Sequence, residues 1–217
     1  MKNGWQAPLG ALVLVVLFAA FMSRPINTAS DIAAWVQGVG SLLAIIAAVW
    51  IYAKQYEDKK AADVAETRAF VEAIRDEVRA TWAGYCIEIH PAVTALAPGK
   101  YFNMIYPVST DGFSIYNNSA HMVGKIDDPQ LRSLVVGTYV QARGLINSFL
   151  LNNAMLAEYK SLARAYGLPN RDAVLEAQLV NLQDYACKLK QIDEGVSEAV
   201  TALLTCIDQW LAEHPLR

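Results

Sequence analysis

Two long apolar segments stand at the beginning of the chain. Residues 4–23 and residues 32–53 contain no Asp, Glu, Lys or Arg. Each segment is about 20 residues long, and a helix of that length crosses roughly 30 Å of hydrocarbon. The pattern predicts a transmembrane helical hairpin with spans at about 5–23 and 32–53, followed by a separate domain over residues 54–217.

A cleaved signal peptide is the alternative for the first apolar segment. Lys2 followed by an apolar run is typical of one. Cleavage also needs a pair of small residues at fixed spacing before the cut. The sequence around Met22 supplies no well-placed pair, so we expect the first helix to stay uncleaved.

The distribution of basic residues predicts the orientation of the hairpin. Lys2 precedes the first span, and Lys54, Lys59 and Lys60 follow the second. Arg24 is the one basic residue between the spans. Because cytoplasmic flanks carry the excess of Lys and Arg, both termini are expected in the cytoplasm.

The second span has a start signal and a face of small residues. Thr28 and Asp31 have capping-box spacing at its beginning. Small or weakly polar residues then recur at three- and four-residue steps, which lets helices approach closely in lipid. This face predicts packing against the first span, an oligomer contact, or both. Its members are Gln37, Gly40, Ser41, Ala44, Ala47 and Ala48.

No helix breaker follows the second span until Pro91. Apolar positions over residues 54–90 recur at heptad-like spacing, as in a coiled coil. We therefore expect the membrane helix to continue into the cytoplasm as one long helix. Its stripe could face a neighbouring subunit or the chain's own last helix. The stripe comprises Val64, Thr67, Val71, Ile74, Val78, Thr81 and Tyr85.

The rest of the chain predicts an irregular connection and two more long helices. Residues 91–128 hold scattered Pro and Gly and many aromatic residues, with one short helix expected around Ile115–Val123 and stopped by Gly124. Asp127-Asp128-Pro129 is a helix start, and that helix is expected to reach about Tyr166. Asn170 is expected to cap a last helix from Arg171 to about Ala212. The fold class predicted is all-α, a membrane hairpin followed by a cytoplasmic bundle of long helices.

Composition argues against several classes of function. Removing Lys2, Arg24 and Asp31 from 18 basic and 21 acidic residues leaves 16 and 20, a net charge of −4 beyond the hairpin. Binding of bulk nucleic acid is therefore not expected. The three Cys residues and three His residues lack metal-ligand spacing. No phosphate-binding loop or nucleophile elbow is present, so no metal, cofactor or catalytic residue is predicted.

One polar cluster is the candidate ligand site. Amide, imidazole and amino groups gather just before the Asp-Asp-Pro helix start, and three polar residues spaced by four share a face of the next helix. Such groups suit a small anionic or nucleotide-like ligand. The alternative is that they satisfy the backbone of an irregular loop. The candidates are Asn117, Asn118, Ser119, His121, Lys125, Tyr139, Arg143 and Asn147.

Three segments carry a resemblance to known proteins. The sequence Asp-Ile-Ala-Ala-Trp-Val-Gln-Gly-Val-Gly-Ser at 31–41, the run Phe-Ser-Ile-Tyr-Asn-Asn-Ser-Ala at 113–120, and Gly124-Lys-Ile-Asp-Asp with the helix around Tyr139–Leu145 resemble uncharacterised bacterial two-span inner-membrane proteins. The resemblance implies a location in the bacterial inner membrane. In layout the chain also resembles membrane effectors of anti-phage defence systems, which is an analogy of architecture only.

The sequence favours a non-enzymatic inner-membrane protein whose cytoplasmic bundle binds a partner or a signal. In its sharper form the protein is a membrane-perturbing defence effector, homo-oligomeric through a seam along the second span and the long helix. A membrane-anchored scaffold is one alternative, and an enzyme with a small-ligand site in residues 101–147 is another. The predicted seam comprises Gln37, Gly40, Ser41, Ala44, Ala48, Val64, Val71 and Val78.

Overall fold

The computed structural model describes residue 15 and residues 28–109, 112–165 and 169–215. Within this part of the chain 85% of residues are helical and none forms a strand, which confirms the all-α class. The chain divides into two compact units, Met1–Ala61 and Ala62–Arg217. The predicted first span lies outside the described residues apart from Val15, so the hairpin stays a prediction.

A single helix, α2 (Ala29–Glu88), covers the predicted second span and the heptad-like segment. It begins at the expected capping box. The Thr28 N–H donates to Asp31 Oδ2 over 3.0 Å, and the Asp31 N–H donates to Thr28 Oγ1 over 3.3 Å. The reciprocal bonds satisfy backbone donors that a helix start leaves open.

Among the described residues, two helices are long and apolar enough to cross a membrane. The most apolar window of α2 has a mean hydropathy of 2.0, and none of it is buried. The window in α5 (Pro129–Arg164) has a mean hydropathy of 1.2 and is 33% buried. Partial burial is typical of a core helix, whereas no residue in the apolar window of α2 is buried.

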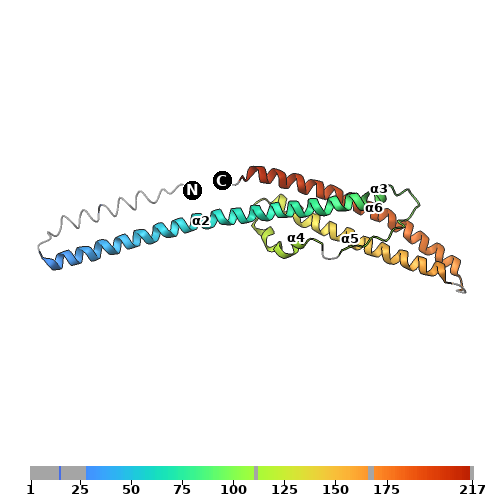
Figure 1. Cartoon of the computed structure of the whole chain (residues 1–217), viewed down its shortest axis with the longest axis horizontal. Coiled ribbons are helices and arrows are strands. Elements are labelled where there is room, and N and C mark those ends of the chain that lie inside the picture. The colour runs from blue at the N-terminus through green and yellow to red at the C-terminus, as the bar shows by residue number, and fades with distance from the viewer. Residues whose placement is uncertain (1–14, 16–27, 110–111, 166–168, 216–217) are drawn as a thin grey trace. The chain divides into compact units, whose positions relative to one another are not determined.

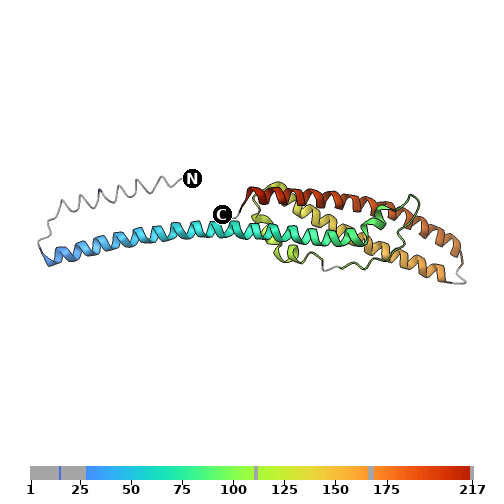
Figure 2. The same ribbon diagram turned by 45° about the horizontal axis from the view of Figure 1, so that its top comes forward.

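The second unit is a bundle of three long helices: the Ala62–Glu88 part of α2, α5, and α6 (Arg171–Glu213). α5 and α6 lie side by side as an antiparallel pair (Figures 1 and 2). Their backbones approach each other closely, and no comparably close approach joins α2 to either. Side chains therefore span the space between α2 and the α5–α6 pair.

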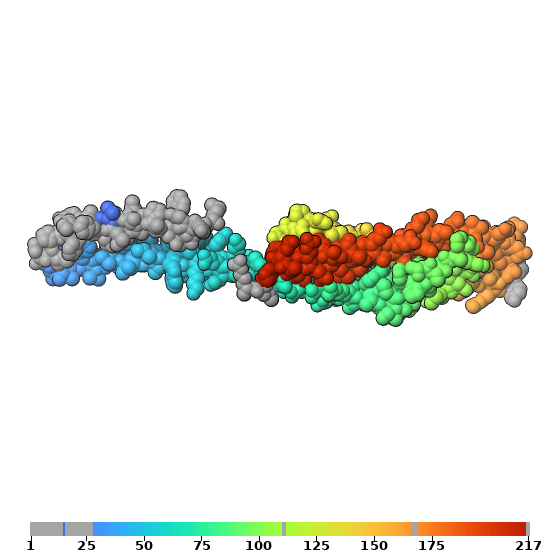
Figure 3. Space-filling model, turned by 90° about the horizontal axis from the view of Figure 1, so that it is seen from above, coloured from blue at the N-terminus to red at the C-terminus, as the bar shows by residue number. Residues whose placement is uncertain are grey.

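Polar contacts also join α2 to α6, which lie next to each other in the space-filling view (Figure 3). Arg79 donates to Asp208 Oδ2 over 2.6 Å. Arg68 donates to the Leu211 carbonyl over 2.8 Å and to the His214 carbonyl. Arg68 thus satisfies carbonyl groups that the end of α6 leaves without a helical partner.

The heptad-like stripe of α2 packs inside its own unit. Val71 is 1% exposed and Val78 is 5% exposed, and Thr67 and Ile74 are also buried. Of the two interpretations of the stripe, the structure favours packing within one chain. Val71 and Val78 are therefore not available to a neighbouring subunit, whereas Val64 is 52% exposed.

Helices α5 and α6 begin at the residues predicted from the sequence, but their first turns are capped differently. Asp128 caps α5 as expected, accepting a hydrogen bond from the Gln130 N–H over 2.8 Å, with Pro129 in the first turn. Asn170 precedes α6 in the left-handed conformation (φ 59°) and its side chain forms no cap bond. The predicted side-chain cap is therefore wrong, because Asn170 serves as a left-handed turn residue instead.

The connection between α2 and α5 contains three short helices: α3 (His90–Thr94), α4 (Ser114–Ser119) and the 3-10 helix η1 (Ala120–Lys125). α2 ends before Pro91, which lies in the first turn of α3, where a proline is tolerated. The prediction that Gly124 stops the short helix is wrong, since η1 continues through Gly124 to Lys125.

Candidate functional site

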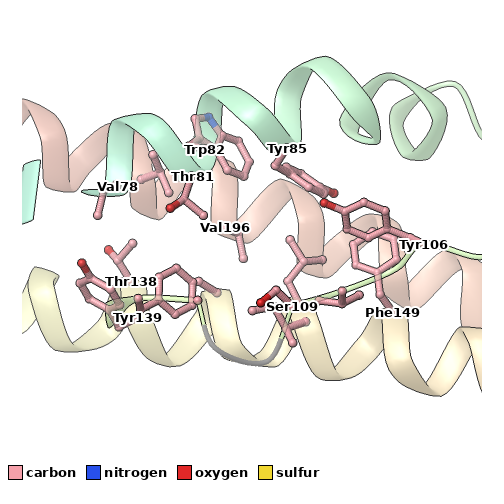
Figure 4. Close-up of a pocket in the computed structure, with 17 residues that line it drawn as sticks. Val78, Thr81, Trp82, Tyr85, Tyr106, Ser109, Thr138, Tyr139, Phe149 and Val196 are labelled. Carbon is pink, nitrogen blue, oxygen red and sulfur yellow. The ribbon is translucent and has the colours of Figure 1, made fainter. Parts of the chain in front are cut away.

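A half-open cavity of about 190 Å³ lies in the second unit. Figure 4 shows that side chains from α2, α5, α6 and the segment before α4 surround it. It occupies the space that α2 leaves beside the α5–α6 pair. An engineered apolar cavity of about 150 Å³ binds benzene, so this one is large enough for a ligand of similar size.

The wall of the cavity is mainly apolar and rich in aromatic rings. Ring pairs meet edge to face, with centroids 5.3 Å apart for Tyr106 and Phe149 and 5.1 Å apart for Phe113 and Tyr139. This is the favoured arrangement of packed aromatic rings. The aromatic members of the wall are Trp82, Tyr85, Tyr106, Phe113, Tyr139 and Phe149.

A few hydroxyl groups interrupt the apolar wall. Thr81, Ser109 and Thr138 line the cavity. The Thr138 hydroxyl donates to the Ala199 carbonyl of α6 over 3.3 Å. An apolar cavity with a small number of placed polar groups is the usual form of a small-molecule site.

Glu77 ties the cavity wall to the short helix α4. Its carboxylate accepts the Tyr139 hydroxyl over 2.7 Å, and it also accepts the Ile115 N–H over 2.7 Å and the Tyr116 N–H over 3.1 Å. A carboxylate at a helix start satisfies open N–H groups there. Burial, followed by the bond to Glu77, raises the pKa of the Tyr139 phenol well above its usual value.

A second carboxylate lies behind Tyr85. Asp193 of α6 is fully buried and accepts the Tyr85 hydroxyl at Oδ1. His90 Nδ1 lies 3.1 Å from Oδ1 and 3.0 Å from Oδ2 of Asp193, but Oδ2 has no well-aligned donor among the described residues. Burial, followed by the bond to Asp193, raises the pKa of the Tyr85 phenol well above its usual value.

Part of the sequence-predicted site comes together beside the cavity. Arg143 donates to the Asn117 side-chain oxygen, and its guanidinium lies 5.8 Å from the centre of the Tyr116 ring. The Tyr116 ring stacks on Tyr139, with centroids 3.9 Å apart and planes 12° apart. Only Tyr139 of these four residues lines the cavity.

The remaining predicted site residues have no side-chain hydrogen bond to Arg143, Asn117 or Tyr139 in the described part of the chain. Lys125 pairs with Glu66 over 2.7 Å and lies 3.9 Å from Asp63. Asn118, His121 and Asn147 are exposed on the surface. The predicted ligand set thus divides into a cluster around Tyr139, an ion pair of Lys125, and three exposed residues.

Sequence reasoning missed Glu77 and Asp193, which accept hydroxyl groups of two residues that line the cavity. Each bonds to residues far along the chain: Glu77 to residues 38, 39 and 62 positions away, and Asp193 to Tyr85, 108 positions away. The one local signal is the position of Asp193 on the apolar face of α6, four residues after Leu189.

No group of three His, Cys, Asp or Glu side chains comes together as a metal site in the described part of the chain. Comparison with protein-family models, with curated proteins and with solved structures found no match. The physical properties of the cavity and of the apolar helix therefore carry the functional interpretation.

Proposed function

We propose that this chain is an integral membrane protein whose cytoplasmic bundle binds a small, mainly apolar molecule. The observation that carries the proposal is the aromatic cavity in the second unit. A concave and mainly apolar pocket with a few placed polar groups is the usual form of a small-molecule site. A cavity of about 190 Å³ with a few hydroxyl groups in its wall therefore favours a binding role.

The membrane part of the proposal rests on the apolar portion of α2. Residues 32–53 carry no charge. Large apolar side chains on this stretch are exposed, including Val36, Leu43 and Val49, each at 60% or more. Such exposure over a whole span is typical of a helix surrounded by lipid. Together with the uncharged residues 4–23, it supports the hairpin with both termini in the cytoplasm.

The cavity wall also offers a route by which a ligand would change the surface of the bundle. Tyr139 lines the cavity and bonds to Glu77, which in turn holds the start of α4. Tyr106 and Ser109 bring the segment before α4 into the same wall. A ligand in the cavity would contact residues that hold α4, so binding could favour one arrangement of the bundle surface, as in a sensor.

The test is ligand-dependent stabilisation of the full chain in mild detergent. A panel of single-ring compounds, including toluene, phenol and indole, is added while helix content is followed during heating. A ligand at 100 times its Kd stabilises the folded state by about 2.7 kcal/mol. We expect at least one compound to raise the melting temperature.

A cavity-filling substitution supplies the control. Ala142 lines the cavity, so Ala142→Leu should abolish the ligand-dependent shift while leaving the protein folded. Ala157, exposed on the same helix, is the matched position, and Ala157→Leu should keep the shift. If no compound acts on the unaltered chain, or if Ala142→Leu responds like Ala157→Leu, the binding role is wrong and a scaffold role is favoured.

A further inference from the structure

Two acidic side chains stand behind the polar part of the cavity wall. Glu77 accepts the hydroxyl hydrogen of Tyr139, and Asp193 accepts that of Tyr85. Both tyrosines line the cavity. A hydroxyl that donates to a carboxylate is polarised, and its oxygen becomes a better acceptor. Each of these two hydroxyl groups therefore brings negative potential to the wall.

No cationic side chain among the described lining residues offsets this negative potential. Among the described residues that line the cavity there is no Lys, Arg or His. Glu77 is bound by two N–H groups and one hydroxyl, with no ion pair to a described cationic side chain. His90 lies beside Asp193 and offsets that charge when protonated. Among the described residues, Glu77 is therefore a carboxylate behind the wall that forms no ion pair.

The aromatic lining adds to the same preference. Six of the lining residues are Trp, Tyr or Phe. The face of an aromatic ring carries partial negative charge and attracts a cation, most strongly where water is excluded. Rings that surround an ammonium group thus replace part of the hydration that it loses on entering an apolar site.

We infer that the cavity takes a small hydrophobic organic cation, an ammonium group carried by a single ring or a comparably short apolar group. The inference rests on the proposed function, because it names the charge of the ligand for the same cavity. The volume of about 190 Å³ sets the size limit. A free anion would be repelled by the carboxylates, and no cation among the described lining residues would offset them.

The test compares three probes of similar shape by titration calorimetry on the full chain in a nonionic detergent. Phenyltrimethylammonium is the cation, tert-butylbenzene is its neutral isostere, and benzenesulfonate is the anion. We expect the cation to bind about tenfold more tightly than tert-butylbenzene, and benzenesulfonate not to bind. If tert-butylbenzene binds as tightly as the cation, or benzenesulfonate binds best, the inference is overturned while the proposed function stands.

Removing the charge of Glu77 gives the matched comparison. Glu77→Gln removes the negative charge and keeps an acceptor for Tyr139. The affinity for phenyltrimethylammonium should therefore fall about tenfold, while the affinity for tert-butylbenzene should stay within about twofold. Glu72→Gln is the control, since Glu72 pairs with Arg68 on the same helix and does not line the cavity. Unchanged cation binding in folded Glu77→Gln would overturn the inference.

A second variant tests the inference if Glu77→Gln does not fold. Asp193→Asn removes the other carboxylate and keeps an acceptor for Tyr85, so it should weaken the cation severalfold more than the neutral probe. Equal weakening of both probes would indicate a packing change and would overturn the charge preference. If none of the three probes and none of the neutral panel binds, the proposed function itself fails.

Discussion

At the residue scale, the hydroxyl of Tyr139 links the cavity to Glu77. Tyr139 is 1% exposed, and its hydroxyl lies 2.7 Å from the carboxylate. Tyr139→Phe removes a hydrogen bond to a charged acceptor, so the free energy of unfolding should fall by about 1.5–3 kcal/mol. Tyr101 has no hydroxyl bond across the bundle, and Tyr101→Phe should change it by less than about 0.5 kcal/mol. Urea unfolding followed by circular dichroism measures both, and equal effects would contradict the contact.

Tyr85 and Tyr139 also predict an effect of alkaline pH. Burial and the neighbouring carboxylates raise both pKa values above their usual value near 10. The contribution of the two phenols to the free energy of unfolding is therefore fully present below pH 10. It is lost as the pH rises above that value, because the unfolded chain can then ionise these phenols. Tyrosines that ionise in the folded protein raise the absorbance at 295 nm during an alkaline titration. Because Tyr139 is not expected to be among them, Tyr139→Phe should leave the size of this rise unchanged. A smaller rise would show that Tyr139 ionises normally in the folded protein.

Sequence reasoning found the surface partners at this scale and missed the buried ones. Tyr139 and Arg143 share a helix face because they are four residues apart, and Asn117 lies beside them as the folded-back connection required. Glu77 and Asp193 look like ordinary charges of amphipathic helices. Their roles depend on which helix covers them, and one sequence does not contain that information.

At the element scale, α4 is held from two sides with unequal strength. Glu77 accepts two N–H groups at its start, whereas Arg143 reaches Asn117 from an exposed position. Glu77→Ala should lower the free energy of unfolding by about 2 kcal/mol, since it leaves three partly buried donors without their acceptor. Arg143→Ala should cost less than about 0.5 kcal/mol. Urea unfolding separates them, and a larger loss for Arg143→Ala would reverse this ranking.

Helix ends show what was predictable among the elements. The capping box at Thr28 and the cap at Asp128 are local patterns, and both form as predicted. α4 instead follows Phe113 in the left-handed conformation (φ 69°), which few large residues adopt. Burial of Phe113 against Tyr139 and the bonds from Glu77 hold that conformation. These contacts join residues far apart in the sequence, so no local sequence pattern predicts them.

At the scale of the whole molecule, the predicted oligomer seam separates into two halves. Val71 is 1% exposed in its own bundle, so Val71→Asp should unfold the second unit by burying an unpaired charge. Gly40 has open space around it on the apolar part of α2, so Gly40→Leu should leave the melting temperature unchanged and weaken any contact between copies in lipid. Mass measurement in mild detergent and melting curves check both. A folded Val71→Asp would contradict the bundle.

The most direct measurement is ¹⁹F nuclear magnetic resonance of the full chain labelled with 5-fluorotryptophan. The chain has five Trp residues, and Trp82 lines the cavity. Titration with phenyltrimethylammonium should shift the resonance that Trp82→Phe removes, and Ala142→Leu should abolish the shift. If the Trp82 resonance stays still at saturating ligand, or only Trp35 and Trp50 in the apolar segment respond, the bundle does not bind the ligand in its cavity.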